Sequence, residues 1–144
     1  MALKHKDKPM TFDEAMALYG KKARKPQGNE EHCIQCKCVQ WFSDHYPELK
    51  GRLFAVPNGG FRNPKTASDM KDEGVVAGVS DLILLVKNKR YGALLIEMKA
   101  PGKYQQPVQK QWEKIVTAKG EYKYVVCRSL DEFIKVITEY LNDQ

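Results

Sequence analysis

The residues of this chain with the clearest chemical potential are a glutamate and a lysine in the otherwise apolar run YGALLIEMKAPG, residues 91–102. Side chains alternate between the two faces of a β-strand, so Glu97 and Lys99 should share one face while Ile96 and Met98 lie on the other. Burying a carboxylate is costly unless it is paired or binds a metal. The pair therefore either lies on a solvated face or has a function.

A second carboxylate, Asp81, precedes the apolar run of residues 82–86, which is typical of a strand buried on both faces. Residues 87–92 form a short connection, so the two strands should pair antiparallel and bring Asp81 close to Glu97. Carboxylate oxygens suit Mg²⁺ or Mn²⁺, which tolerate partly hydrated sites and also bind phosphate oxygens. Lys99 could hold the attacking water or neutralise charge in a phosphoryl transition state. The alternative is a weak ion pair on a solvated strand face.

The elements that must position these residues follow from hydrophobic periodicity and from capping and turn signals. We expect helices at about residues 11–20, 29–46, 63–74, 107–119 and 129–141, and strands at about residues 52–57, 82–86, 92–99 and 122–128. Thr11 with Glu14, and Ser129 with Glu132, are typical of capping boxes. The order of elements predicts an α/β protein with a mixed central sheet flanked by helices.

Length and charge predict one domain with a basic arm. A chain of 144 residues that is 42% hydrophobic can build a single sizeable core. Residues 1–28 hold seven Lys or Arg against three acidic residues, which is +4 of the total net charge of +6. We therefore expect a basic N-terminal arm at residues 1–28 and a folded domain at residues 29–144. Such an arm suits nucleic acid, and the alternative is a solvated tail that aids solubility.

Other partners are not expected. No apolar run approaches the roughly 18 to 20 residues of a membrane span, and the first residues lack the apolar stretch of a secretory signal. The segment HCIQCKC, residues 32–38, is tempting as a zinc site. A structural zinc site pairs two ligand clusters, and a helix would point these cysteines in different directions. We expect no membrane partner, no zinc, free thiols and a cytoplasmic location.

Five motifs in order, EHCIQ, VPNGGFR, GVVAGVSDLILL, YGALLIEMKAPG and QKQW, together resemble the VRR-NUC family of virus-type replication-repair nucleases. The resemblance covers about residues 30–141 and implies the PD-(D/E)xK, restriction-endonuclease-like core. Two positions depart from the family pattern. Ser80 stands where the family's name has a proline, and Gln106 is a poor helix N-cap.

The resemblance implies a set of catalytic residues, which are Glu31, Asp81, Glu97, Lys99 and Gln109. In the family pattern, Asp81 and Glu97 bind Mg²⁺ or Mn²⁺ with the main-chain carbonyl of Met98, and Lys99 is the catalytic lysine. Glu31 supports the metal site or its water, and the helix glutamine orients the lysine or the water. Without the family, Glu31 is an acid favoured by a helix N-terminus.

The resemblance also places the Asn58-Gly59-Gly60 turn near the active site, where glycines and Arg62 would let the chain approach a phosphate. A plain β-turn is the alternative. Basic residues elsewhere are candidate contacts to the DNA backbone, namely Lys65, Lys21, Lys22, Arg24 and Lys25. Each of them alone is equally compatible with a solvated surface charge.

The activity implied is a metal-dependent DNA endonuclease that leaves a 5′-phosphate and a 3′-hydroxyl. Short stand-alone members look like homodimeric Holliday-junction resolvases, so we expect a homodimer that acts on branched DNA, a four-way junction. A bacterial or phage-infected cell is the expected setting, with the protein on the nucleoid when it is bound to DNA. The alternatives are a monomeric flap or nicking nuclease of repair or replication, and a non-catalytic DNA-binding module.

Overall fold

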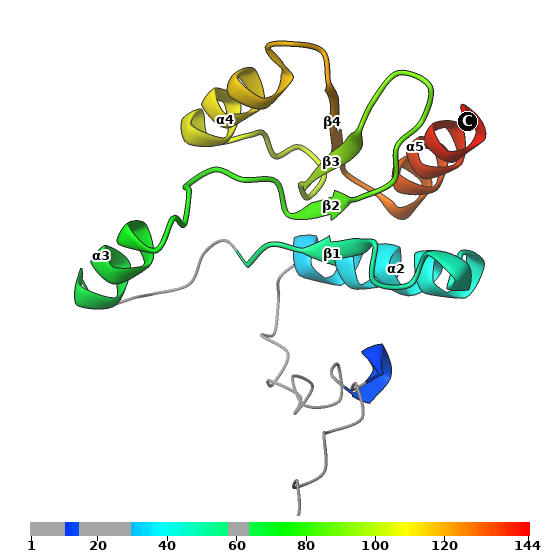
Figure 1. The fold of residues 1–144 in the computed structure, drawn as a ribbon, viewed down its shortest axis with the longest axis horizontal. Coiled ribbons are helices and arrows are strands. Elements are labelled where there is room, and N and C mark those ends of the chain that lie inside the picture. The colour runs from blue at the N-terminus through cyan, green and yellow to red at the C-terminus, as the bar shows by residue number, and fades with distance from the viewer. Residues whose placement is uncertain (1–10, 15–29, 58–63) are drawn as a thin grey trace, which may run out of the picture.

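The computed structural model describes residues 11–14, 30–57 and 64–144. Their central element is a four-stranded sheet (Figure 1). The strands are β1 (Leu53–Ala55), β2 (Leu82–Leu84), β3 (Ala93–Met98) and β4 (Tyr122–Cys127), and they lie in this order. β1 pairs with β2 and β2 with β3 antiparallel, whereas β3 and β4 are parallel. The mixed central sheet predicted from the sequence is confirmed.

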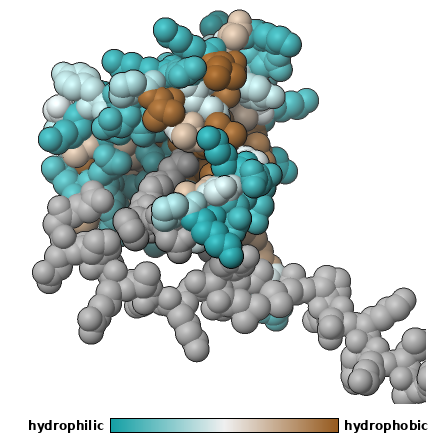
Figure 2. Space-filling view, turned by 90° about the vertical axis from the view of Figure 1, so that its left-hand side faces the viewer, coloured by the Kyte–Doolittle hydropathy of each residue, from teal (hydrophilic) through white to brown (hydrophobic). Residues whose placement is uncertain are grey.

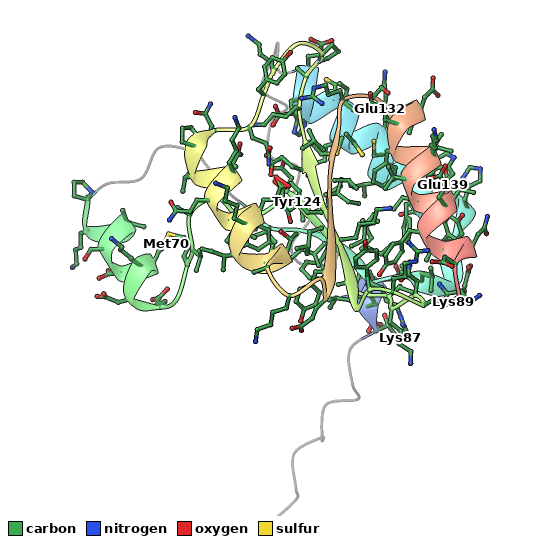
Figure 3. All side chains as sticks on the ribbon, turned by 90° about the horizontal axis from the view of Figure 1, so that it is seen from above. Met70, Lys87, Lys89, Tyr124, Glu132 and Glu139 are labelled. Carbon is green, nitrogen blue, oxygen red and sulfur yellow. The ribbon has the colours of Figure 1, made fainter. Side chains whose placement is uncertain are left out.

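Helices cover both faces of the sheet, as predicted. The helices that follow residue 29 are α2 (Glu30–His45), η1 (Pro47–Leu49), α3 (Pro64–Asp72), α4 (Pro107–Thr117) and α5 (Leu130–Asn142), of which α3 lies away from the sheet (Figure 1). Seen from above, α4 lies on one side of the strands and α2 and α5 lie on the other (Figure 3). α4 connects the two parallel strands, which need such a crossover. In the part of the chain that the structure describes, no helix has the length and apolar character needed to cross a membrane.

The core lies between the sheet and the α2–α5 layer. All six residues of β3 are buried, and every second one, Leu94, Ile96 and Met98, belongs to the core cluster, as the expected alternation requires. The side chains of one β3 face join helix side chains in a single cluster, Cys38, Phe42, Leu82, Leu84, Leu94, Ile96, Met98, Cys127, Phe133, Ile137 and Tyr140. The other face of β3, which carries Glu97, is turned toward α4. One central strand therefore serves the core on one face and polar chemistry on the other.

β2 is shorter than the apolar run that predicted it. The strand ends at Leu84, and Leu85 is 54% exposed, so the expected extension to Val86 is wrong. A turn follows a few residues later, where the Asn88 side chain accepts hydrogen bonds from the backbone N–H groups of Arg90 and Tyr91, at 3.0 and 2.8 Å. An asparagine that bonds its own backbone in this way favours a turn over a continuing strand.

The first described residues contact the folded domain. The predicted capping box is present, because the N–H of Thr11 donates to Glu14 Oε2 at 2.9 Å and the N–H of Glu14 donates to Thr11 Oγ1 at 3.2 Å. Asp13 forms an ion pair with Lys50, just after η1. Residues 15–29 lie outside the described residues, so the division of the chain at residue 28 stays a prediction.

The start of α5 offers a test of how this helix is held. The N–H of Glu132 donates to Ser129 Oγ at 3.1 Å, and the N–H of Arg128 donates to Glu132 Oε2 at 2.6 Å. Ser129→Ala should lower the free energy of unfolding by about 1 kcal/mol, because it removes the acceptor at the N-cap. Ser68→Ala, in the exposed middle of α3, should cause no loss, since alanine is the better helix former. Urea denaturation measures both, and equal losses would contradict the capping role.

Candidate active site

Asp81 and Glu97 face one another across the β2–β3 pair. Leu82 pairs with Ile96, and extending this antiparallel register by one residue puts Asp81 opposite Glu97. Residues directly opposite in an antiparallel pair project from the same face of the sheet. Asp81 Oδ2 also accepts a 2.7 Å hydrogen bond from the N–H of Met98, which holds the aspartate at this end of the sheet. The predicted approach of the two carboxylates is therefore present.

The two oxygens of Glu97 have different surroundings. Its side chain is fully buried, and Oε1 accepts a 2.8 Å hydrogen bond from Gln109 Nε2. Lys99 Nζ lies 3.6 Å from the same Oε1. Oε2 is buried and has no hydrogen-bond partner. The facing Asp81 side chain interacts with this carboxyl and favours a proton on Glu97. Once Glu97 is ionised, Oε2 has no donor among the described residues, which is costly for a buried oxygen.

Burial and like charge raise the pKa of Glu97. Loss of hydration is the larger cause and the neighbouring Asp81 carboxylate adds to it, which brings the pKa to about 8 against the opposing effect of Lys99. Burial also raises the pKa of Glu31, and Lys99 again opposes the change. Asp81 contributes to the shift at Glu31 as well. Four charged side chains therefore lie close enough to affect one another's pKa: Glu31 on α2, and Asp81, Glu97 and Lys99 at the ends of β2 and β3.

Gln109 connects the start of α4 to Glu97. Its Oε1 accepts a 2.7 Å hydrogen bond from the N–H of Gln106, the residue that precedes the helix. A backbone N–H can only donate, so this contact assigns the amide orientation and leaves the Nε2 group to donate to Glu97. The sequence left the start of this helix in doubt because Gln106 is a poor N-cap. Gln109 compensates, and the same side chain fixes the rotamer of the glutamate.

Gly78 allows the loop before β2 to pack directly on the first turn of α4. Its φ is +85°, and a Cβ atom built there would lie 2.4 Å from the carbonyl oxygen of Val108. That separation is far inside van der Waals contact with backbone, so the helix start would have to move. The sequence analysis did not single out this glycine, because nothing in a GVVAGVSD pattern shows which helix approaches it.

An open cavity of about 420 Å³ lies beside the charged group. Its lining residues are Glu30, Glu31, Lys99, Ala100, Lys103, Tyr104 and Gln106. It brings the start of α2 together with the loop that follows β3. Sequence reasoning found Glu31 and Lys99 but missed Lys103 and Tyr104, for which closeness to Lys99 in the sequence is the only signal.

Tyr124 and Gln105 support the same face of the sheet. Tyr124 pairs with Leu95 in the β3–β4 register and lies between the strands and α4 (Figure 3). Gln105 Nε2 donates to the Tyr124 hydroxyl and to Glu113 Oε1, both at 3.0 Å. Burial, and then the charge of Glu97, raise the pKa of the Tyr124 hydroxyl. These contacts hold the loop after Lys99 against α4, and no sequence motif predicted them.

The donor set fits a hard divalent cation. Glu97 Oε2 is buried without a partner, and the Asp81 carboxylate projects from the same face. Within residues 11–14, 30–57 and 64–144, no group of three or more His, Cys, Asp or Glu side chains converges on a metal-binding point, so the fit rests on two carboxylates. Mg²⁺ typically binds one or two carboxylates and keeps several waters. The expected role of the Met98 carbonyl as a third ligand stays a prediction.

Other predicted residues lie elsewhere. Lys65 is exposed on α3 and does not line the cavity that contains Lys99. The remaining predicted DNA contacts lie outside the described residues, namely Asn58, Gly59, Arg62, Lys21, Lys22, Arg24 and Lys25. Along α2, Cys38 is buried in the core whereas Cys33 and Cys36 are exposed, so these thiols face in different directions.

Comparison with known proteins identifies the family. The model of the VRR-NUC domain matches residues 29–131. The chain belongs to the VRR-NUC domain family. A solved structure, described as a VRR_NUC domain protein, is 28% identical in sequence and superimposes with a TM-score of 0.67, over 82% of this chain and 93% of that chain. The search of curated proteins gave no significant match.

The predicted family resemblance is therefore confirmed, and with it a nuclease-type fold. A VRR-NUC domain suggests a nuclease, and a nuclease domain implies DNA as substrate. The roles of Asp81, Glu97 and Lys99 in catalysis stay predictions.

The contact at Gly78 predicts the effect of adding one methyl group. Gly78→Ala should lower DNA cleavage on the order of 10²-fold, because it displaces the start of α4 and with it Gln109. Gly120→Ala is the matched control, since Gly120 also has a positive φ, +69°, but has no atom near the added Cβ. Both variants carry the backbone strain of alanine at positive φ, and only the first should move Gln109. Equal cleavage by the two variants would contradict the positioning role.

The pKa of Glu97 predicts how stability depends on pH in the metal-free protein. The folded carboxyl titrates near 8 and the unfolded one near 4.5, so between these values the folded state holds an extra proton. The free energy of unfolding therefore falls as pH rises through this window. Glu97→Gln removes the titration, so its stability relative to wild type should increase with pH and then level off.

Urea denaturation in EDTA at about pH 5 and about pH 9 measures this difference. Glu139→Gln is the control, since Glu139 is exposed on α5, on the other side of the strands from α4 (Figure 3). Its effect on stability should be similar at both pH values. A Glu97→Gln difference that does not change with pH would show that the carboxyl titrates normally.

Proposed function

We propose that the protein is a divalent-metal-dependent DNA endonuclease with its centre at Asp81, Glu97 and Lys99. The observation that carries the proposal is the buried, unpartnered Oε2 of Glu97, on the same face as the Asp81 carboxylate. Burial and the Asp81 carboxylate disfavour the ionised form of Glu97, and a cation held between the two side chains would reverse this and attract phosphate. A module that only binds DNA gains nothing from such a pair, which disfavours the non-catalytic alternative.

Lys99, Gln109 and Glu97 have different roles in the proposed hydrolysis. A divalent cation, when bound, supplies positive charge for the scissile phosphate and a lowered pKa for water. The Lys99 side chain is only 9% exposed. Because little water competes there, its ammonium can donate a strong hydrogen bond to an anionic phosphate oxygen. Gln109 and Lys99 both act on Glu97 Oε1, which leaves Oε2 directed to other ligands.

The reaction is water attack at phosphorus in line with the leaving oxygen. The new bond joins the water oxygen to phosphorus, and the bond from phosphorus to the 3′ oxygen breaks. The attacking water gives up a proton to solvent, the 3′ oxygen takes one from solvent and leaves as a hydroxyl, and the 5′ side retains the phosphate. Glu31, in the cavity beside Lys99, is placed to accept a hydrogen bond from water there.

The substrate we propose is a four-way DNA junction cut by a homodimer. Support comes from apolar surface available to a second copy: on α4, Val108 and Ile115 are 44% and 66% exposed, seven residues apart on one side of the helix. Figure 2 shows hydrophobic patches among hydrophilic side chains on the side of the molecule that carries α3 and α4 in Figure 1. A two-fold axis would set two active sites against opposed strands of a junction.

Cleavage assays with three DNA forms test the activity and the substrate together. The wild type should cut a labelled four-way junction at paired positions with Mg²⁺ or Mn²⁺ and not with EDTA. Asp81→Asn keeps an acceptor for the Met98 N–H but loses the charge, so cleavage should fall by about 10²-fold or more while DNA binding remains. Glu139→Gln should cleave like the wild type.

The outcomes separate the candidates. Cuts confined to a flap, or spread along a duplex, together with a monomer by light scattering, would support the flap or nicking nuclease and exclude the resolvase. Binding without any metal-dependent cut would support the DNA-binding module. Full activity of Asp81→Asn would contradict the proposed centre.

A further inference from the structure

Tyr104 is an exposed aromatic side chain that lines the cavity beside Lys99. It is 73% exposed, the largest exposed fraction among the large hydrophobic side chains of the described residues. It lies in the loop between β3 and α4, five residues after Lys99. The cavity of about 420 Å³ is lined by Tyr104 together with Lys99 and Glu31. A ligand that contacts the ring is therefore next to the residues proposed to cut DNA.

Arg128 supports the ring. Its guanidinium carbon lies 5.3 Å from the centre of the Tyr104 ring, a cation–π contact. Its Nε donates a 3.1 Å hydrogen bond to the carbonyl oxygen of Lys103, so the guanidinium is tied to the same loop. The backbone of Arg128 is held in turn, through its N–H, by Glu132 Oε2. The ring is thus supported on one side, and most of its surface stays open.

The sheet explains why these residues meet. β3 and β4 are parallel, and Met98 pairs with Cys127, so both strands end at the same edge. The loop with Lys103 and Tyr104 leaves one strand end, and Arg128 follows the other. The edge therefore carries an aromatic ring flanked by two cations, beside the Glu97–Lys99 pair.

We propose that Tyr104, with Arg128 and Lys103, is a stacking site for an unpaired base of the DNA strand that is cut. The site rests on the proposed endonuclease function and adds a substrate class to it, DNA with an unpaired base, which a four-way junction offers only where a base pair opens at the branch point. A base within a continuous duplex is covered on both faces by its neighbours, so it cannot stack on a protein ring. A base at a flap, gap or branch point can, and aromatic rings and arginine are the side chains on which such bases stack. Lys103 supplies charge for the adjoining phosphate.

Binding of fluorescent DNA to the full-length chain tests the proposal without cleavage. The protein carries Asp81→Asn, and EDTA is present. The probes hold 2-aminopurine either at an unpaired position beside a branch or inside a continuous duplex, because stacking on an aromatic ring quenches its fluorescence. Tyr104→Ala should weaken binding of the unpaired probe on the order of tenfold and remove the quenching. Tyr104→Phe should restore both, since it keeps the ring.

The matched control is Tyr122→Ala. Tyr122 is 40% exposed and pairs with Ala93, at the opposite end of the β3–β4 pair, so its loss should leave quenching unchanged. Duplex binding should be the same in all variants. Equal weakening of duplex and unpaired probes by Tyr104→Ala would overturn the stacking site in favour of a general backbone contact. So would quenching that persists without the ring.

Cleavage by the wild type separates this proposal from the one on which it rests. If wild type cleaves DNA with Mg²⁺ and Tyr104→Ala has the same preference for branched over duplex DNA, only the stacking site is wrong. If wild type neither binds nor cleaves any of the DNA forms, both proposals are wrong.

Discussion

Burial of the Glu97 carboxylate in the central strand is the constraint on which the rest of the site depends. A charged group with no exposure raises the free energy of the fold unless its oxygens are satisfied, and here only Oε1 is. Three features stabilise the Glu97 side chain in this position. The Gln109 amide and the Lys99 ammonium contact Oε1, and the close packing of Gly78 on α4 keeps Gln109 in place. The remaining oxygen and the facing Asp81 form the proposed cation site.

The fold tolerates this cost because β3 has a second face. Its aliphatic side chains join those of α2 and α5 in the main core, so the strand stays fixed although its polar face is destabilised. Functional sites often break the rules that the rest of a sequence obeys and are compensated elsewhere. Here the compensation comes from the same strand, because alternate residues of β3 form the apolar face and the polar face.

Local pattern was enough to predict the architecture and the two carboxylates. The alternation around Glu97 gave its face, and the short connection before Tyr91 gave the antiparallel pairing that puts Asp81 opposite. The end of β2 was missed because an apolar run does not show where cross-strand pairing stops. Gly78 and the double role of Gln109 were also beyond the sequence, since each depends on a contact between segments whose distance no periodicity encodes. The DNA contacts on residues 21–25 and 58–62 stay predictions, the first from the charge of the N-terminal arm and the second from the family resemblance.

The parallel β3–β4 pair explains why the proposed catalytic residues and the proposed stacking site at Tyr104 lie at the same edge of the sheet. Parallel strands deliver their carboxyl ends to the same edge, so the loop after Lys99 and the residue after Cys127 are neighbours although about 25 residues separate them in sequence. The charged group lies within the sheet and is fixed by strand register, whereas Tyr104 lies on the connecting loop. Loops vary more readily than the strands that carry them. Substitution in this loop is therefore expected to change the proposed stacking site without moving Asp81 or Glu97.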